Sequence, residues 1–180
     1  MTGAKISRTK LNNTLVFIIN LLNDNNIKNW FIGYGTLLGI VRENSCIDGD
    51  DDIDIIIDES NYDLVKKLLI ENNIIIEYGY DINDSTNILK TKDNKDYCSV
   101  DFYMAYLDEK GNFKDTWNNV IWSECYNKKN GALQPFLWNG HILYLPANYK
   151  QKLVNRYGEN WKIPQNSKGL WWDGVKKYIL

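Results

Sequence analysis

Apolar residues recur at helical spacing near the start of the chain and then give way to short apolar runs. Between Leu11 and Leu22 they stand three or four positions apart, which predicts an amphipathic helix packed on a sheet. The run 30–32 predicts a first strand, and the β-branched run 53–57 predicts a buried one. Polar interruptions and the lack of a small-residue cleavage site argue against a signal peptide, and no apolar stretch is long enough to span a bilayer.

The rest of the chain continues to alternate between helical and extended patterns. Ser60 is a candidate N-cap for a helix that ends near Asn72 and Asn73, and Pro146 is a candidate start for a helix that ends at Gly158. The remaining predicted elements are strands at 74–76, 87–90 and 97–104 and a hairpin at 137–142 with a type I′ turn. This alternation predicts an α+β fold, a mixed sheet flanked by helices, in a single domain over residues 1–180.

A run of aspartates leads directly into the predicted buried strand. Alternation along a strand would place Asp50, Asp52 and Asp54 on one face and Asp51 on the other. Side chains two positions apart lie about 6.6–7 Å from each other, so Asp52 and Asp54 can both reach one ion at about 2 Å. Ligand sets made only of oxygen favour Mg²⁺ or Mn²⁺. We therefore expect Asp52 and Asp54 to bind a metal, with Asp50 as a secondary candidate.

A glycine-containing turn precedes this strand. Gly33 and Gly35 permit backbone conformations that other residues resist, and Thr36 can open a short helix whose N-terminus would bind a phosphate. Arg42 offers a forked donor to another phosphate, or else pairs with nearby acids in a structural role. A phosphate site beside an acidic strand predicts a metal-dependent phosphoryl or nucleotidyl transferase. The alternatives are an ordinary turn and a solvated or calcium-binding acidic loop.

One further aspartate lies within a predicted strand. Asp101 has apolar and aromatic neighbours on both sides in 97–104, where an acid is unfavourable. It is either a third carboxylate of the same site, as a metal ligand or as the acceptor of a hydroxyl proton, or an edge-strand acid that faces water.

These motifs resemble a known family. The order of residues 35–42, Ile47 and 50–54 resembles the signature of the LicD family, which includes bacterial phosphocholine transferases and fukutin-related ribitol-phosphate transferases. That family belongs to the nucleotidyltransferase-fold superfamily of DNA polymerase β type. The strand around Asp101 and the segment 145–164 extend the resemblance, which covers about residues 15–165 and leaves the tail 166–180 outside. Asp48-Gly49 stands where the family usually has Pro-Trp.

The resemblance implies a reaction and its partners. The donor would be a CDP-linked alcohol such as CDP-choline or CDP-ribitol, the acceptor a glycan hydroxyl, and the leaving group CMP. Asp52, Asp54 and Asp101 would be catalytic and metal-binding, and the glycine turn with Thr36 and Arg42 would hold the donor. Two alternatives remain open at this level. One is transfer of a nucleoside monophosphate from a nucleoside triphosphate, and the other is a sugar- or choline-binding module without turnover.

Composition limits the partners and the cellular compartment that we expect. The net charge of −2 argues against a nucleic-acid partner, which usually requires a basic face. Three widely spaced cysteines indicate neither a disulfide framework nor a zinc site, so we expect a reducing compartment. Because the apolar segments also suit neither a signal peptide nor a membrane span, we expect a soluble, cytoplasmic protein. The single histidine, His141, adjoins the predicted hairpin turn and is expected to be structural. The sequence does not determine the oligomeric state.

Overall fold

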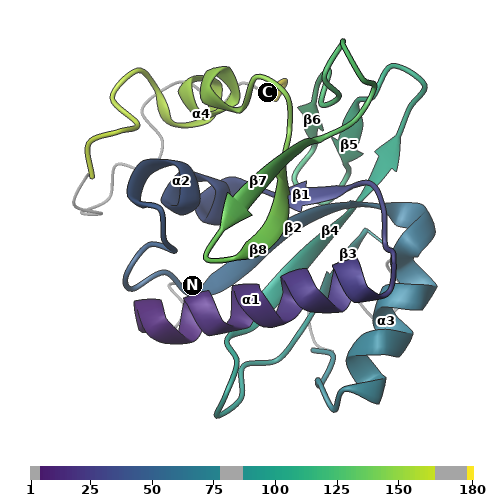
Figure 1. Ribbon diagram of the computed structural model, residues 1–180, viewed down its shortest axis with the longest axis vertical. Helices are drawn as coiled ribbons and strands as arrows, with labels where there is room; N and C mark the ends of the chain where they lie inside the picture. The colour runs from purple at the N-terminus through teal and green to yellow at the C-terminus, as the bar shows by residue number, and fades with distance from the viewer. Residues whose placement is uncertain (1–4, 78–86, 165–177) are drawn as a thin grey trace.

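A mixed β-sheet forms the middle of the protein, with helices around it (Figure 1). The computed structural model describes residues 5–77, 87–164 and 178–180. The strands are β1 (Trp30–Ile32), β2 (Asp52–Asp58), β3 (Ile88–Lys90), β4 (Ser99–Leu107), β5 (Phe113–Asp115), β6 (Val120–Trp122), β7 (Gln134–Trp138) and β8 (His141–Leu145). The helices are α1 (Arg8–Asp24), α2 (Tyr34–Glu43), α3 (Tyr62–Glu71) and α4 (Tyr149–Tyr157), with a 3₁₀ turn at Glu59–Asn61.

The sheet is organised around β2 and β4. Its order is β1-β2-β4-β5-β6, and β3 pairs with the same long strand β4. β2 and β4 run parallel, whereas the other pairs of this sheet are antiparallel. The interior positions of β2 are buried from Ile53 to Ile57, as expected for a strand covered on both faces. The predicted α+β class with a mixed sheet is confirmed.

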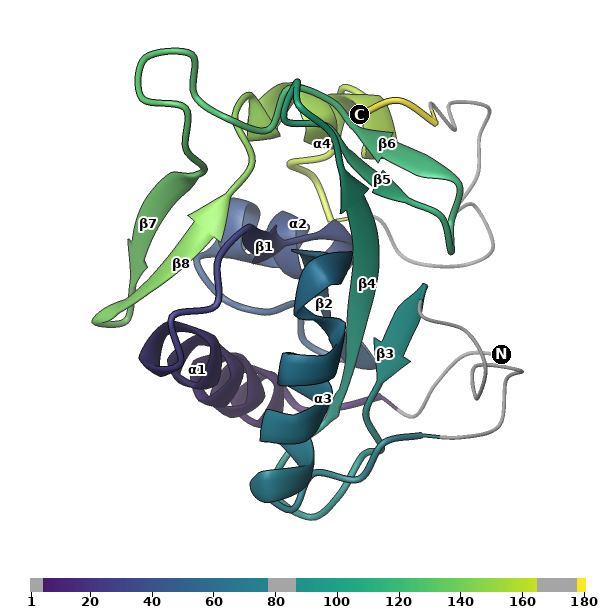
Figure 2. The ribbon, with the colours of Figure 1, turned by 90° about the vertical axis from the view of Figure 1, so that its right-hand side faces the viewer.

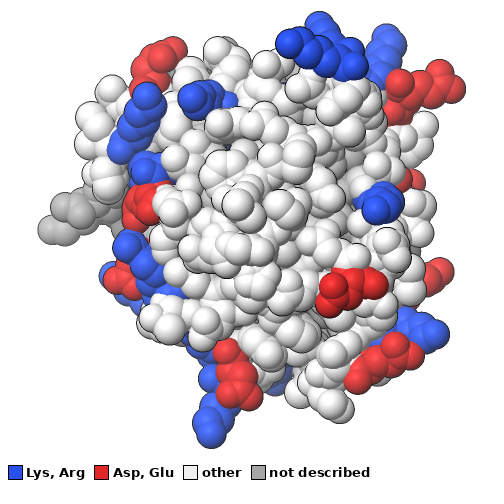
Figure 3. All heavy atoms as spheres, in the orientation of Figure 1, with Lys and Arg blue, Asp and Glu red and all other residues white. Residues whose placement is uncertain are grey.

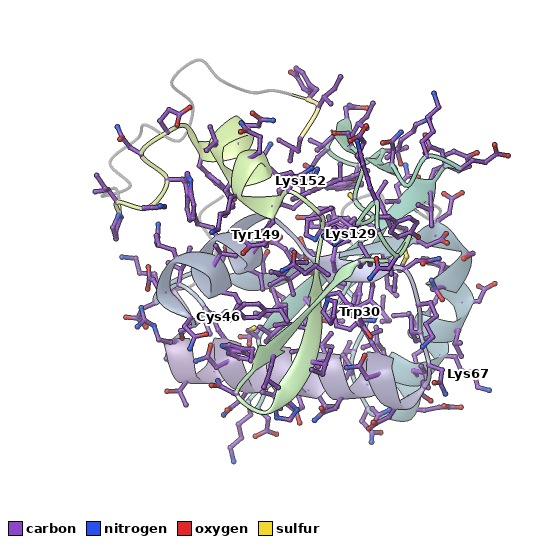
Figure 4. The ribbon with its side chains drawn as sticks, turned by 45° about the horizontal axis from the view of Figure 1, so that its top comes forward. Trp30, Cys46, Lys67, Lys129, Tyr149 and Lys152 are labelled. Atoms are coloured by element: carbon purple, nitrogen blue, oxygen red, sulfur yellow. The ribbon has the colours of Figure 1, made fainter. Side chains whose placement is uncertain are left out.

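One side of this sheet is covered by α1 and by the β7–β8 hairpin (Figure 2). The apolar positions that predicted the first helix are buried along α1, and the Ser7 hydroxyl caps its N-terminus by accepting from the Lys10 N–H. Figure 4 shows Trp30 beneath the hairpin, where its ring meets that of Tyr144 edge-on at 5.2 Å. Aromatic packing therefore joins β1 of the central sheet to the separate two-stranded sheet.

Several local predictions are confirmed. The first strand has the predicted bounds, and α3 ends before Asn72. The hairpin turn has positive φ at both central residues, 48° at Asn139 and 82° at Gly140, as a type I′ turn requires. The imidazole of His141 lies 2.9 Å from the side-chain oxygen of Asn20 and so ties the hairpin to α1.

Three local predictions are wrong. Residues 74–76 form no strand, because only Ile76 pairs, in a single bridge to Thr91. Ser60 does not cap α3, since its own N–H donates to the Asp58 carboxylate and a 3₁₀ turn intervenes before the helix. Pro146 does not begin α4, which starts at Tyr149. The intervening chain is instead held to another loop by a hydrogen bond from the Ala147 N–H to a carbonyl.

The last described residues return to the sheet. Ile179 forms a parallel bridge with Ile121 of β6, and Leu180 is buried. The carbonyl of Leu180 accepts from the hydroxyl of Ser123 and from Lys152 of α4, which is labelled in Figure 4. Residues 178–180 of the tail therefore dock on the sheet, while Trp171 and Trp172 lie outside the described residues.

The face that carries the β7–β8 hairpin is largely uncharged. Figure 3 shows lysine, arginine and acidic side chains around the rim of this face and few near its centre. Leu137 and Ile142 of the hairpin are exposed. Within the described ranges, no helix combines the length and apolar character needed to cross a membrane. The three cysteines are buried free thiols.

Replacement of Gly39 by alanine tests how closely α2 packs. A Cβ at this position would lie 2.7 Å from the Ser45 carbonyl oxygen and 3.0 Å from the Ile47 nitrogen, both of them backbone atoms that cannot easily move. We expect Gly39→Ala to lower the free energy of unfolding by about 1–3 kcal/mol in urea denaturation. Helix propensity alone would raise it by about 0.8–1.0 kcal/mol, so an increase would contradict the close approach.

Candidate active site

Parallel pairing of β2 with β4 brings the predicted acids together. Asp54 and Asp101 are register partners on these neighbouring strands, and Lys90 of β3 is the partner of Asp101 on its other side. Paired residues of adjacent strands point to the same face of the sheet. The three side chains therefore form a charged row across β2, β4 and β3. We call its two carboxylates, Asp54 and Asp101, the acidic row.

Asp54 is buried and held by several donors. One carboxylate oxygen accepts from the Gly35 N–H at 2.9 Å, and the other accepts from the Tyr103 hydroxyl at 3.2 Å. Its backbone N–H donates to the Thr36 hydroxyl at 2.8 Å. These contacts fix the carboxylate at the point where α2 begins, so the glycine turn and the acidic strand form one unit.

The structure gives the glycine turn a different physical basis from the predicted one. Gly33 precedes α2 with an ordinary extended φ of −113°, and the helix begins at Tyr34 rather than at Thr36. The glycines are needed for space. A Cβ on Gly35 would lie 2.8 Å from an Asp50 carboxylate oxygen, and one on Gly33 would lie 2.8 Å from a side-chain carbon of Ile56.

The aspartates before β2 gather at its start. The strand begins at Asp52, so strict alternation does not extend to Asp50 and Asp51. Carboxylate oxygens of Asp50, Asp51 and Asp52 all lie within 4.8 Å of one another. The predicted separation of Asp51 on the opposite face is therefore wrong, because the residue lies outside the regular strand.

Burial and mutual repulsion disfavour the charged forms of these acids. Burial, assisted by Asp51, raises the pKa of Asp50 to about 6. The pKa values of Asp52 and Asp54 are also raised, first by burial and then by neighbouring carboxylates. Burial likewise raises the pKa of Asp101, although the Lys90 ammonium opposes this shift. A bound cation would offset the repulsion.

Lys90 is a site residue that the sequence prediction missed. Its ammonium nitrogen lies 2.8 and 3.1 Å from the two carboxylate oxygens of Asp101 and 3.9 Å from an Asp52 oxygen. The residue was placed at the end of a predicted strand, but nothing local in the sequence indicated which strand would lie beside it. Tyr103 could have been found, because it stands two positions after Asp101 and so shares its face.

Arg42 is paired within α2. Its guanidinium contacts the carboxylate of Glu43, with the Nε at 3.0 Å, and Glu43 in turn binds Arg8 at 2.7 Å. This matches the structural alternative considered for Arg42, and its contact with a phosphate stays a prediction. The same holds for Gly35 and Thr36, whose observed hydrogen bonds go to Asp54.

Residues of α4 complete the surroundings. The guanidinium carbon of Arg156 lies 4.9 Å from the centre of the Tyr34 ring. Burial raises the pKa of Tyr157, and the nearby Asp54 carboxylate adds to the shift. The Tyr34 hydroxyl donates to the buried carboxylate of Asp115, which links the start of α2 to the β5–β6 turn. Nothing local in the sequence indicated these contacts between distant segments.

The donor set fits a hard divalent cation. Every candidate ligand is a carboxylate oxygen, as Mg²⁺ and Mn²⁺ prefer, and the absence of a Cβ on Gly35 leaves room for the Asp50 and Asp54 carboxylates to approach. The raised carboxyl pKa values have the sign expected of a site completed by positive charge.

Comparison with protein families gives one extensive match. A profile of the LicD/FKTN/FKRP nucleotidyltransferase domain matches residues 26–162, which includes α2, the acidic strand and Asp101. No curated protein matches the sequence significantly.

Solved structures with low sequence identity share the fold. The lincosamide antibiotic adenylyltransferase LnuA, solved with lincomycin bound, has a TM-score of 0.54 and 15% identity, with 83% of this chain and 85% of that chain covered. ANT(2″)-Ia in complex with adenylyl-2″-tobramycin gives 0.51 and 14%, covering 74% and 68%. An antigenic nucleotidyltransferase-like protein from Paracoccidioides brasiliensis gives 0.54 and 15%, covering 86% and 69%. The fold is thus that of nucleotidyltransferases.

Thr36 offers a test of how the turn supports the acidic strand. Thr36→Val removes the acceptor of the buried Asp54 N–H, so we expect a loss of about 1–3 kcal/mol in the free energy of unfolding, measured in urea. Thr36→Ser keeps the hydroxyl and should lose less. A larger loss in Thr36→Ser than in Thr36→Val would show that the methyl group, which valine keeps and serine lacks, matters more than the hydrogen bond.

The raised carboxyl pKa values predict how stability depends on pH. Unfolded aspartate has a pKa of about 3.9, so the folded chain binds more protons above that value. The stability that these protonated carboxyl groups contribute to the folded protein is complete below about pH 4, and it is lost as the pH rises through their folded-state pKa values. In chelator, Tm should therefore fall between about pH 5 and pH 8.

Asp54→Asn and the exposed control Asp63→Asn check the origin of that trend. Asp54→Asn should flatten the fall, while Asp63→Asn should leave it unchanged, because Asp63 lies in the first turn of α3 and belongs to no part of the site. Mg²⁺ should raise Tm more at about pH 8 than at about pH 5, since the ligands must be ionised to bind it. A Tm that rises with pH in chelator would refute the assignment.

Proposed function

Because the chain belongs to the LicD/FKTN/FKRP nucleotidyltransferase-domain family and is a transferase enzyme, we propose that it moves a phospho-alcohol from a CDP-linked donor to a glycan hydroxyl. The products would be the substituted glycan and CMP. The observation that carries the proposal is the acidic row on β2 and β4, fixed against the first turn of α2.

The aspartates at the start of β2 would hold the metal. Asp52 and Asp54 lie on the strand itself, and the Asp50 carboxylate lies against Gly35 beside them. Bound Mg²⁺ or Mn²⁺ supplies positive charge at the donor's pyrophosphate and stabilises the leaving phosphate. Asp101 would orient the acceptor hydroxyl and accept its proton, since its carboxylate adjoins the metal-binding pair.

The first turn of α2 would face the phosphates of the donor. Helix N-termini attract anions through exposed N–H groups and the helix dipole. Gly35 and Thr36 hold Asp54 in place, so this end of the helix positions the metal-binding carboxylate and the donor together. A setting with reducing conditions is part of the proposal, since the three cysteines are free thiols.

A second candidate reaction is nucleotidyl transfer from a nucleoside triphosphate. One structural neighbour is named a lincosamide antibiotic adenylyltransferase and another is in complex with adenylyl-2″-tobramycin, which favours keeping this alternative in the test. The same carboxylates would serve, but the leaving group would be pyrophosphate. Family membership favours a transferase over the binding module without turnover that the sequence left open.

Calorimetric titration with nucleotides distinguishes these reactions. We expect a CDP-alcohol, tested as CDP-choline, CDP-ribitol and CDP-glycerol, to bind only with Mg²⁺ and to yield CMP when a glycan acceptor is added. Asp54→Asn should reduce turnover by about 100-fold or more, because the variant loses a charged group that positions the reacting phosphate. Asp63→Asn is the matched control and should retain wild-type turnover.

The other outcomes are equally informative. Binding of CTP or ATP alone, with pyrophosphate release, would replace phospho-alcohol transfer by nucleotidyl transfer. Nucleotide binding that persists without metal and in Asp54→Asn would overturn the proposed role of the acidic row.

A further inference from the structure

The Lys90 ammonium occupies a cation position inside the acidic site. It contacts both carboxylate oxygens of Asp101 and approaches Asp52, from a strand that lies beside β4. We propose that Lys90 is a built-in cation that replaces one divalent ion, so that the site binds a single metal at the β2 aspartates and Asp101 is not a metal ligand. This inference rests on the proposed metal-dependent function.

The position of Lys90 is fixed by the sheet. Its Cα is the register partner of Asp101, and its backbone carbonyl accepts from the Glu77 N–H at 2.8 Å. The side chain is only 22% exposed and needs no unusual reach, because adjacent strands lie about 4.8 Å apart. Lys90 is thus held at the β4 end of the row rather than meeting it by chance on a mobile surface.

The negative charge of the acidic row is compensated differently on its two strands. At the β4 end, the ammonium donates a hydrogen bond to Asp101 Oδ2 at 3.1 Å and lies 2.8 Å from Oδ1, which has no hydrogen-bond partner among the described residues. At the β2 end, Asp54 accepts from a backbone N–H and a tyrosine hydroxyl, which are neutral donors. The oxygens of Asp50, Asp51 and Asp52 also converge there within 4.8 Å. Positive charge is already supplied at one end and required at the other.

A divalent ion on Asp101 would have to displace or repel the ammonium. Like charges that share one carboxylate repel strongly in a partly buried site. With Lys90 present, Asp101 keeps one orientation next to the single ion, where it can accept a hydrogen bond from the acceptor hydroxyl. Lys90 therefore acts through Asp101 as a positioning residue and does not itself meet the reacting atoms.

Counting bound Mn²⁺ tests the inference directly. Equilibrium dialysis with electron paramagnetic resonance should find one Mn²⁺ per wild-type chain and no spin–spin broadening. Lys90→Gln should bind a second Mn²⁺ on the Asp101 carboxylate, which then lacks its ammonium partner, and show that broadening. Lys90→Arg restores the charge and should return to one ion. Lys114→Gln, which removes an ion pair with Asp108 elsewhere in the sheet, is the matched control and should also bind one.

Each alternative result has a distinct meaning. Two ions in the wild type, or one ion of unchanged affinity in Lys90→Gln, would overturn the role of Lys90 while leaving the metal-dependent function intact. No Mn²⁺ binding in any variant would overturn the proposed function and this inference with it.

Asp101→Asn keeps the test decisive if Lys90→Gln does not fold. Since Asp101 is not expected to be a ligand, this variant should retain one Mn²⁺ with an affinity within about threefold of the wild type. A loss of about tenfold or more, the size expected when metal coordination is disturbed, would overturn the inference.

Discussion

The parallel pairing of β2 with β4 is the constraint on which the rest of the site depends. It sets Asp54 beside Asp101 in a buried part of the sheet, where two carboxylates repel each other. The surrounding elements compensate for this repulsion. The start of α2 donates a backbone N–H to Asp54, β4 supplies the Tyr103 hydroxyl, and β3 supplies the Lys90 ammonium. The carboxylates of the site and the groups that offset their repulsion therefore come from the same three strands and the start of one helix.

Much of this arrangement could be predicted because its signals are local. A β-branched run after a series of acids specifies a buried strand with carboxylates at its start, whatever that strand pairs with. The acid within the apolar stretch around Asp101 is unusual enough to stand out on its own. The Asn139-Gly140 turn and the helix end at Gly158 likewise depend on conformations that few other residues adopt.

The remaining features depend on which segments become neighbours, and a single sequence does not contain that information locally. Lys90 resembles any lysine at the end of a strand until β3 pairs with β4. Thr36 resembles a helix-capping residue, but its hydroxyl accepts a hydrogen bond from the N–H of Asp54 in β2. The apolar run at 74–76 is typical of a strand, yet only Ile76 finds a partner. Tertiary pairing overrides local preference in each case.

The crossover between β2 and β4 also governs when the site can form during folding. A parallel pair cannot be closed by a tight turn, and here α3 and β3 lie between the two strands in the sequence. The chain must close this long loop before Asp54 and Asp101 meet, and contacts of such high sequence separation form slowly. The acids of β2 therefore spend the early stages of folding as a charged edge without their partners. That charge discourages the apolar strand behind them from joining other chains.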